Sequence, residues 1–349
     1  MNADNKSINF FNHQHSGCYW YRIKRPMDTL RNCGIPVDIV DIGKDVDLDK
    51  SQTFQLYGAY PMSFEKTLEF LKEKGMKIVY DSDDALDLVD EQNPFYYAVK
   101  KDAWSVQEIL NHTDELTVST PQMAEYFKGK TKAKITVIPN VYDPKDWTFK
   151  RPEREGIRIG FAGSSTHVAD LINIIPTIKK LQDKYNVKFL IMGFGKEDYR
   201  TWFKQFRYVS APEGIKLLEQ LDKLMSEIVF EWIPFVDFEL YPQVLTNMAL
   251  DIGICPLQPT PFNNHRSACK AMEYTLSGAL ALASDTIPYR EDQSSILVKD
   301  NEWEEALTHF IENPENRKAE HAVCLDWIKE NRNCESESYK NLIKSIYTK

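Results

Sequence analysis

The sequence predicts an α/β protein built from two doubly wound domains that face each other across a cleft. Three observations predict this fold. Short apolar runs alternate with amphipathic segments along all 349 residues, the alternation restarts after a polar, proline-bearing stretch at 148–156, and small or acidic residues follow many of the apolar runs. Strands that alternate with helices form parallel sheets, which bind ligands at the carboxyl ends of their strands. Two domains with separate cores are also expected at this length.

The first domain is expected at residues 1–150 and contains six predicted strands. The predicted strands are 7–12, 37–41, 53–56, 77–80, 115–119 and 134–139. Apolar residues recur at helical spacing in 19–33 and 61–74, which predicts helices that end at Gly34 and Gly75. A further helix is expected to begin at Pro121, because proline suits the first turn of a helix.

The pattern restarts at Ile157, which predicts a second Rossmann-like domain at 151–330. Its predicted strands are 157–162, 187–192, 229–233, 251–256, 279–284 and 296–299. The segment 169–184 is amphipathic and predicts one continuous helix. Small residues in the preceding loop, 163–167, let backbone amides approach a phosphate group at the N-terminus of that helix.

Composition excludes several classes of protein. The formal charge of −9, from 43 basic and 52 acidic residues, argues against general binding to nucleic acid. No apolar run is long enough for a membrane span, and the N-terminal residues do not resemble a signal peptide. The six cysteines are scattered and have no zinc-site spacing. We therefore expect a cytoplasmic protein with reduced thiols.

Polar residues follow the first and fourth predicted strands, at the edge where parallel sheets bind ligands. The residues after the first strand include His13, His15 and Gly17. The acidic residues at the end of the fourth strand are Asp81, Asp83 and Asp84. Asp81-Ser82-Asp83 also has the D-x-D pattern that suits a divalent cation, and capping of a following helix is a third interpretation.

A second group of charged residues surrounds the predicted helix near 270. Arg266, Lys270 and Glu273 are spaced i, i+4 and i+7, which predicts that they share one helix face. The two cations suit a diphosphate and the carboxylate suits ribose hydroxyls. A surface helix with an ordinary charge pattern is the alternative. Arg22, early on the helix at 19–33, is a further residue that could meet an anionic group.

Four stretches resemble GT-B glycosyltransferases, in particular the retaining family 4 and related bacterial and phage enzymes. The stretches are Tyr21-Arg22 with Pro26, 118–120 with 138–143, 159–167, and 251–257 leading into Ser267, Lys270, Glu273 and 288–291. They follow one another in the family's order over nearly the whole chain. The resemblance implies that the first domain binds the acceptor, that the second binds a nucleotide sugar, and that a helix in 331–349 crosses back onto the first domain.

The resemblance also implies roles for individual residues. Glu273 matches the second glutamate of the family's E-x7-E pattern and would bind the ribose, while Lys270 and Arg266 would hold the diphosphate. Other residues expected at the nucleotide sugar are Gly17, Gly163, Ser164, His167, Pro234 and Ser267. His265 occupies the position of the family's first glutamate, so it would meet the transferred sugar in place of a carboxylate.

The expected activity is transfer of a sugar from a UDP- or GDP-linked donor to an acceptor hydroxyl, with retention and without a metal ion. Asp83 or Asp84 would act at the reacting carbon or on the acceptor hydroxyl. The residues expected to contact the acceptor are Arg22, Asp81 and Tyr96.

The acceptor is expected to be a cell-surface glycan or a lipid-linked glycan, with at most a peripheral contact with a membrane. Three alternatives remain open from the sequence. They are a phage-type enzyme that glycosylates hydroxymethylated DNA bases, a metal-dependent transferase that uses the D-x-D pattern, and a non-catalytic two-domain sugar-binding protein.

Overall fold

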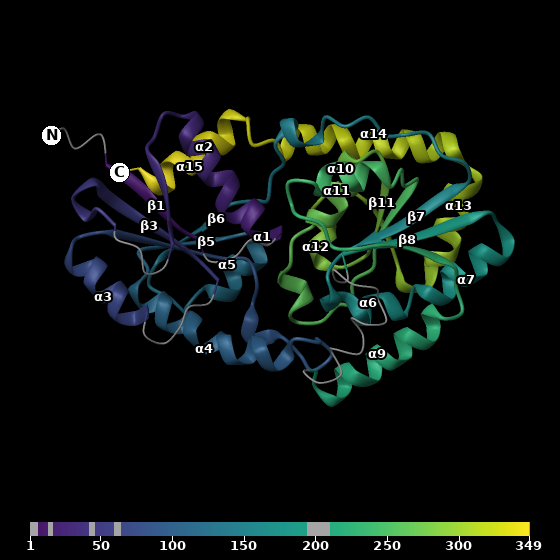
Figure 1. Cartoon of the computed structure of the whole chain (residues 1–349), viewed down its shortest axis with the longest axis horizontal. Helices are drawn as coiled ribbons and strands as arrows, with labels where there is room; N and C mark the ends of the chain where they lie inside the picture. The colour runs from purple at the N-terminus through teal and green to yellow at the C-terminus, as the bar shows by residue number, and fades with distance from the viewer. Residues whose placement is uncertain (1–5, 13–16, 42–45, 59–63, 194–209, 349) are drawn as a thin grey trace.

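The computed structural model describes residues 6–12, 17–41, 46–58, 64–193 and 210–348. Each half of the chain contains one six-stranded parallel sheet with helices on its faces (Figure 1). The first sheet has the order β2-β1-β3-β4-β5-β6 and all of its strand pairs are parallel. Its strands are β1 (Ser7–Asn12), β2 (Val37–Asp41), β3 (Ser51–Tyr57), β4 (Lys77–Ser82), β5 (Glu115–Val118) and β6 (Lys134–Val137).

The second sheet repeats this doubly wound arrangement. Its order is β12-β11-β10-β7-β8-β9 and its strand pairs are again parallel. Its strands are β7 (Ile157–Ala162), β8 (Val187–Met192), β9 (Phe230–Ile233), β10 (Ile252–Cys255), β11 (Leu280–Ser284) and β12 (Ile296–Val298). All twelve predicted strands are therefore present, and the predicted fold of two Rossmann-like domains is confirmed.

Helices cover both sheets. In the first half they are α1 (Gly17–Tyr19), α2 (Arg25–Asn32), α3 (Glu65–Glu73), α4 (Tyr96–His112) and α5 (Pro121–Phe127), and a π-helical turn at Trp20–Lys24 joins α1 to α2. In the second half they are α6 (Val168–Ile172), α7 (Ile175–Lys184), α9 (Pro212–Met225), α10 (Tyr241–Asn247), α11 (Cys269–Leu276), α12 (Ile287–Arg290), α13 (Trp303–Glu312), α14 (Pro314–Asn331) and α15 (Glu337–Tyr347).

One predicted helix is divided in two. The sequence predicts a continuous helix over 169–184, but α6 ends at Ile172 and α7 begins at Ile175. Pro176 lies in the first turn of α7. Proline has no N–H to donate and its ring clashes with the preceding turn, so a new helix begins there. The break leaves α6 as a short helix after the loop that follows β7.

Close packing of α11 against β10 depends on a glycine. A Cβ atom on Gly253 of β10 would overlap the ring of Tyr274, which is fully buried. The Tyr274 hydroxyl accepts a hydrogen bond from the backbone N–H of Ala162 at the end of β7. Because α11 also carries Lys270 and Glu273, this packing fixes their distance from the carboxyl ends of the strands.

The C-terminal helices return the chain to the first half. In Figure 1, α14 and α15 (yellow) run along one side of the molecule and α15 lies beside α2. Tyr347 of α15 packs against Phe10 of β1 with ring centroids 5.4 Å apart, and its hydroxyl donates to Gln55 Oε1 at 2.6 Å. None of the helices in the described ranges combines the length and apolarity needed to cross a membrane.

Candidate functional site

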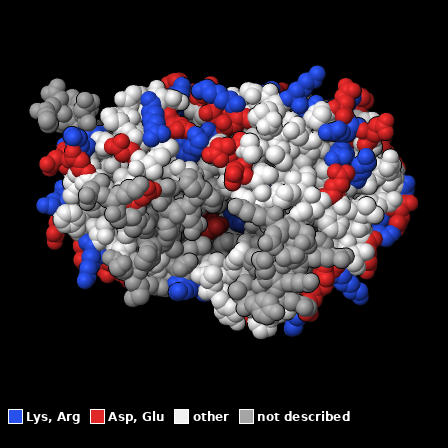
Figure 2. Space-filling model, viewed as in Figure 1, with Lys and Arg blue, Asp and Glu red and all other residues white. Residues whose placement is uncertain are grey.

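A pocket of about 520 Å³ lies between the two halves, at the carboxyl ends of strands from both sheets. Figure 2 shows a hollow at this junction, with acidic and basic atoms inside it. Residues that the first half contributes to its lining are Gly17, Cys18, Tyr21, Asp83, Asp84 and Asn140. Its volume falls in the range of ligand sites in proteins.

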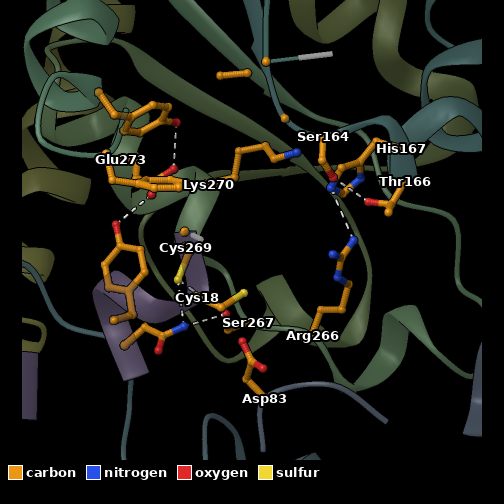
Figure 3. Close-up of a pocket in the computed structure, with 18 of the residues that line it drawn as sticks. Cys18, Asp83, Ser164, Thr166, His167, Arg266, Ser267, Cys269, Lys270 and Glu273 are labelled. Atoms are coloured by element: carbon orange, nitrogen blue, oxygen red, sulfur yellow. Dashed lines mark hydrogen bonds between the residues drawn. The ribbon is translucent and has the colours of Figure 1, made fainter. Parts of the chain in front are cut away.

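The wall formed by the second half carries two cations (Figure 3). The amine of Lys270 is buried, has no hydrogen-bond partner among the described residues, and lies 4.3 Å from the centre of the Phe161 ring. Burial, and after it the charge of Arg266, lowers the pKa of Lys270 to about 8. A Cβ atom on Gly163 would lie 2.6 Å from this amine, so glycine leaves the space that the lysine occupies.

Arg266 is held by a histidine. Its Nη1 lies 3.2 Å from His167 Nε2, and the other ring nitrogen of His167, Nδ1, lies 2.7 Å from Asp170 Oδ2. Both His167 and Asp170 are buried. Burial and the charges of Lys270 and Arg266 hold the pKa of His167 well below its usual value, so the ring is neutral at pH 7.

Glu273 lies at another part of the same wall and joins the two halves. Tyr21 from the first half donates to Oε1 at 2.6 Å, and Tyr241 from α10 donates to Oε2 at 2.9 Å. Burial raises the pKa of Glu273, and the two tyrosine hydrogen bonds oppose that rise. Each carboxylate oxygen accepts more than one hydrogen bond, so Glu273 retains capacity for hydroxyl groups of a ligand.

The wall formed by the first half is acidic. Asp83 follows β4, accepts a hydrogen bond from Tyr57 at 3.0 Å, and lies beside Cys18 on the opposite side of the pocket from Lys270 (Figure 3). Burial, and after it the charge of Asp84, raises the pKa of Asp83 to about 6. The pocket therefore has Lys270, Arg266 and Glu273 on one wall and Asp83 and Asp84 on the other.

Direct contacts hold the two halves together around the pocket. Asn140 Nδ2 donates to Ser267 Oγ at 2.9 Å and lies 2.8 Å from Cys269 Sγ. A Cβ atom on Gly17 would lie 2.9 Å from the Phe238 ring, so this glycine allows α1 to approach the second half closely. The pocket is thus enclosed by residues from both domains.

Comparisons with known proteins give the fold. No family model matches the sequence, and no curated protein matches it. HepE from Anabaena, in complex with UDP and glucose, is 12% identical over 98% of this chain and 99% of its own, with a TM-score of 0.65. An alpha-glucosyltransferase in complex with UDP-glucose and DNA containing an abasic site is 11% identical over 99% of both chains, with a TM-score of 0.65. This chain has the GT-B fold.

A third solved structure with this fold is the trehalose-6-phosphate synthase OtsA. It is 13% identical to this GT-B chain and aligns with 95% of it, which corresponds to 77% of OtsA, with a TM-score of 0.54. The predicted resemblance to GT-B glycosyltransferases is confirmed at the level of the fold.

Most of the predicted nucleotide-sugar residues line the GT-B pocket. Those that do are Gly17, Gly163, Ser164, His167, Arg266, Ser267, Lys270 and Glu273, together with Asp83 and Asp84 of the predicted catalytic set. The predicted common helix face is wrong in one respect. The helix α11 begins at Cys269, and Arg266 lies before it in extended backbone that follows a 3-10 turn at Asn263–His265. Arg266 reaches the pocket from this loop.

Pro234 and His265 are not among the described residues that line the pocket, whereas Phe235 and Val236 are. His265 Nδ1 lies 2.7 Å from the carbonyl oxygen of Pro261, and its ring packs edge-on against Tyr126. The ring is therefore held by the loop and by α5. His13 and His15 lie outside the described residues.

Three predicted acceptor residues are also outside the lining. Tyr96 packs against Tyr97 and under Lys100 on α4. Arg22 and Asp81 are each 1% exposed and form a bidentate ion pair. Arg22 Nε lies 2.9 Å from Asp81 Oδ1, and Nη2 lies 2.7 Å from Oδ2. The prediction that they contact an acceptor is corrected, because each satisfies the charge of the other inside the first domain. Arg22 instead orients Asn140, to whose Oδ1 it donates at 3.0 Å.

The buried pair is expected to be important for stability. Arg22→Met should lower the free energy of unfolding by about 3–5 kcal/mol, because Asp81 would remain buried without its cation. Denaturant unfolding measures the loss. Lys24→Met is the matched control, since its pair with Asp28 is about 30% exposed and should contribute less than about 1 kcal/mol. Equal losses in the two variants would contradict the structural role of Arg22.

Several pocket residues were not predicted from the sequence. They are Cys18, Tyr21, Asn140 and Tyr241, together with Asp170, which contacts His167 but is not among the lining residues. Two signals could have found some of them: Asp170 is three residues after His167, and Tyr21 is four residues after Gly17, which is helical spacing in both cases. Within the described residues, no group of three or more metal-ligating side chains forms a metal site.

Proposed function

We propose that this GT-B chain transfers a glycosyl group from a nucleotide diphosphate-sugar to an acceptor hydroxyl. The buried amine of Lys270, which has no hydrogen-bond partner in the part of the chain that the structure describes, carries the proposal together with Arg266 in the same pocket. A buried ammonium group without a partner is unfavourable, and a diphosphate supplies both the negative charge and the hydrogen-bond acceptors that it lacks. Glu273, in the same pocket, is a suitable acceptor for ribose hydroxyls.

The proposed donor is a UDP-sugar, the ligand class named for the neighbouring structures. Its diphosphate would lie between Lys270, Arg266 and the backbone at Gly163 and Ser164, and its base would lie toward Phe235 and Val236. During transfer the leaving diphosphate gains negative charge. The two cations stabilise this charge directly, so we propose that the reaction needs no metal ion.

The acceptor would bind against the first domain. Asp83 and Asp84 line the pocket opposite the cations, and a carboxylate there can stabilise positive charge at the anomeric carbon or accept the proton of the attacking hydroxyl. The contacts between the halves would exclude water that hydrolyses the donor. We propose transfer with retention, onto a cell-surface or lipid-linked glycan.

A thermal-shift titration tests the donor site. UDP-, GDP-, ADP- and dTDP-sugars are added to wild type and to Glu273→Gln in the presence of EDTA. A ligand at 100 times its dissociation constant stabilises the protein by about 2.7 kcal/mol. We expect a UDP-sugar to stabilise wild type and to have little effect on Glu273→Gln, because the amide cannot accept the same set of hydroxyl hydrogen bonds.

Glu231→Gln is the control, because Glu231 is outside the pocket and pairs with Arg158. It should respond as wild type does. Release of nucleoside diphosphate with glycan acceptors, and with hydroxymethylated DNA as a second acceptor class, distinguishes an enzyme from a non-catalytic binding protein. A wild type that none of the nucleotide sugars stabilises would contradict the proposed function.

A further inference from the structure

Three buried or half-buried side chains form a hydrogen-bonded chain that leads to the pocket. Asp170 accepts at Oδ1 from the backbone N–H of Gln258 (2.7 Å), and its Oδ2 lies 2.7 Å from His167 Nδ1. His167 Nε2 lies 3.2 Å from Arg266 Nη1. The histidine therefore uses both ring nitrogens within the protein.

The chemistry of these groups fixes where the protons are. A guanidinium group only donates hydrogen bonds, so Nε2 of His167 must be the acceptor. In a neutral imidazole the proton is then on Nδ1, which donates to the ionised carboxylate of Asp170. Because ionised Asp170 can only accept and Arg266 can only donate, the direction of both hydrogen bonds to His167 is fixed.

Arg266 depends on its hydrogen bond to this Asp170–His167 pair for its orientation. Among the residues that the structure describes, no carboxylate pairs with Arg266, and its other contact is with the face of the Phe262 ring at 5.4 Å. One hydrogen bond to His167 thus selects one orientation of a long side chain. The remaining N–H groups of the guanidinium stay available to the pocket.

We propose that Asp170 and His167 are positioning residues for the diphosphate. Ionised Asp170 fixes the tautomer of His167, and neutral His167 holds Arg266 where its remaining N–H groups meet a phosphate. This inference rests on the proposed function, but it assigns His167 a different role from the one expected, since its Nε2 binds Arg266 and does not bind the donor.

Asp170→Asn tests the tautomer. The carbonyl oxygen of the introduced amide would keep the hydrogen bond from Gln258 N–H, which turns the amide N–H₂ toward His167 Nδ1. That nitrogen must then accept, the proton moves to Nε2, and two donors face each other at Arg266. Affinity is measured by calorimetry with three probes: UDP, uridine and pyrophosphate. We expect UDP and pyrophosphate to bind about tenfold more weakly, and uridine to bind within about twofold of wild type.

A double-mutant cycle separates positioning from general damage. Arg266→Ala should weaken UDP binding at least as much as Asp170→Asn, and the double variant should match Arg266→Ala within about twofold, because Asp170 acts through Arg266. Asp251→Asn is the matched control. It removes a carboxylate that pairs with Arg151 and Arg317 in the second half and does not line the pocket, so UDP affinity should not change.

His167→Phe provides a second variant if Asp170→Asn folds poorly. It preserves the edge-on ring contact with Phe161 and removes the acceptor nitrogen, so the same selective loss is expected. If wild type binds UDP and both variants bind it with the same affinity, the inference is overturned but the proposed function is not. Equal losses of affinity for uridine and for UDP in the variants would also overturn it, because they would show that Asp170 and His167 have a general structural role. Absence of UDP and pyrophosphate binding in wild type would overturn the proposed function together with it.

Discussion

Lys270→Met is expected to make the ligand-free protein more stable and to abolish its response to a nucleotide sugar. Within the described ranges the buried amine of Lys270 has no hydrogen-bond partner, so the folded state holds an ammonium group that water solvates in the unfolded state. Methionine has a similar length and no charge to desolvate. The loss of the cation should lower kcat/KM about 100- to 1,000-fold, because charge on the leaving diphosphate is less well stabilised.

The pH dependence of the free energy of unfolding measures how much the buried amine of Lys270 destabilises the folded protein. The pKa of Lys270 is about 8 in the folded protein and 10.5 when unperturbed. Between these values the unfolded state binds more protons, so stability rises with pH across this window and is lost as pH falls through 8. This pKa shift corresponds to a loss of folding stability of at most roughly 3 kcal/mol below pH 8. Wild type should show this rise in denaturant unfolding, and Lys270→Met should not.

Lys180→Met is the matched control for this experiment. Lys180 is mostly exposed and pairs with Glu304 on the surface, so its removal should change stability by less than about 1 kcal/mol and leave activity unchanged. A Lys270→Met variant that is less stable than wild type at pH 7 would show that the amine has a stabilising partner in the ligand-free protein.

Local sequence patterns predict the strands because a strand buried on both faces needs a continuous apolar run. β11 is one example, with all five residues of Leu280–Ser284 buried. The place where a parallel sheet binds ligands, at the carboxyl ends of its strands, is equally predictable. Asp83 and Gly163 each directly follow a strand, and both line the pocket. These features depend on neighbours in the sequence.

The remaining features depend on contacts that sequence spacing does not encode. Tyr21 and Glu273 are 252 positions apart and meet only when the two domains are in contact. Arg22 has the same charge whether it faces a ligand or pairs with Asp81, 59 positions away, so its burial could not be predicted from its helix. The resemblance predicts His265 at the transferred sugar, but its ring is held by Pro261 and Tyr126.

Asp83→Asn is expected to remove glycosyl transfer and to preserve donor binding. Asp83 lies on the wall opposite Lys270, and asparagine still accepts the hydrogen bond from Tyr57 but cannot carry negative charge or take up a proton. We expect kcat to fall about 100- to 10,000-fold while the donor KM stays within about threefold. Asp87→Asn, at an exposed position paired with Lys130, is the control that should remain active.

The pH profile of kcat/KM, compared between wild type and Asp84→Asn, tests whether Asp83 is the group that must be ionised, because burial also raises the pKa of Asp170 to about 6. Because the pKa of Asp83 is about 6, the wild-type rate should fall about tenfold for each pH unit below 6. Asp84→Asn should move this limb to lower pH, since the charge of Asp84 is one cause of the raised pKa. A limb that stays near pH 6 in Asp84→Asn would assign the ionisation to another group. Full activity in Asp83→Asn would contradict a catalytic role for this carboxylate.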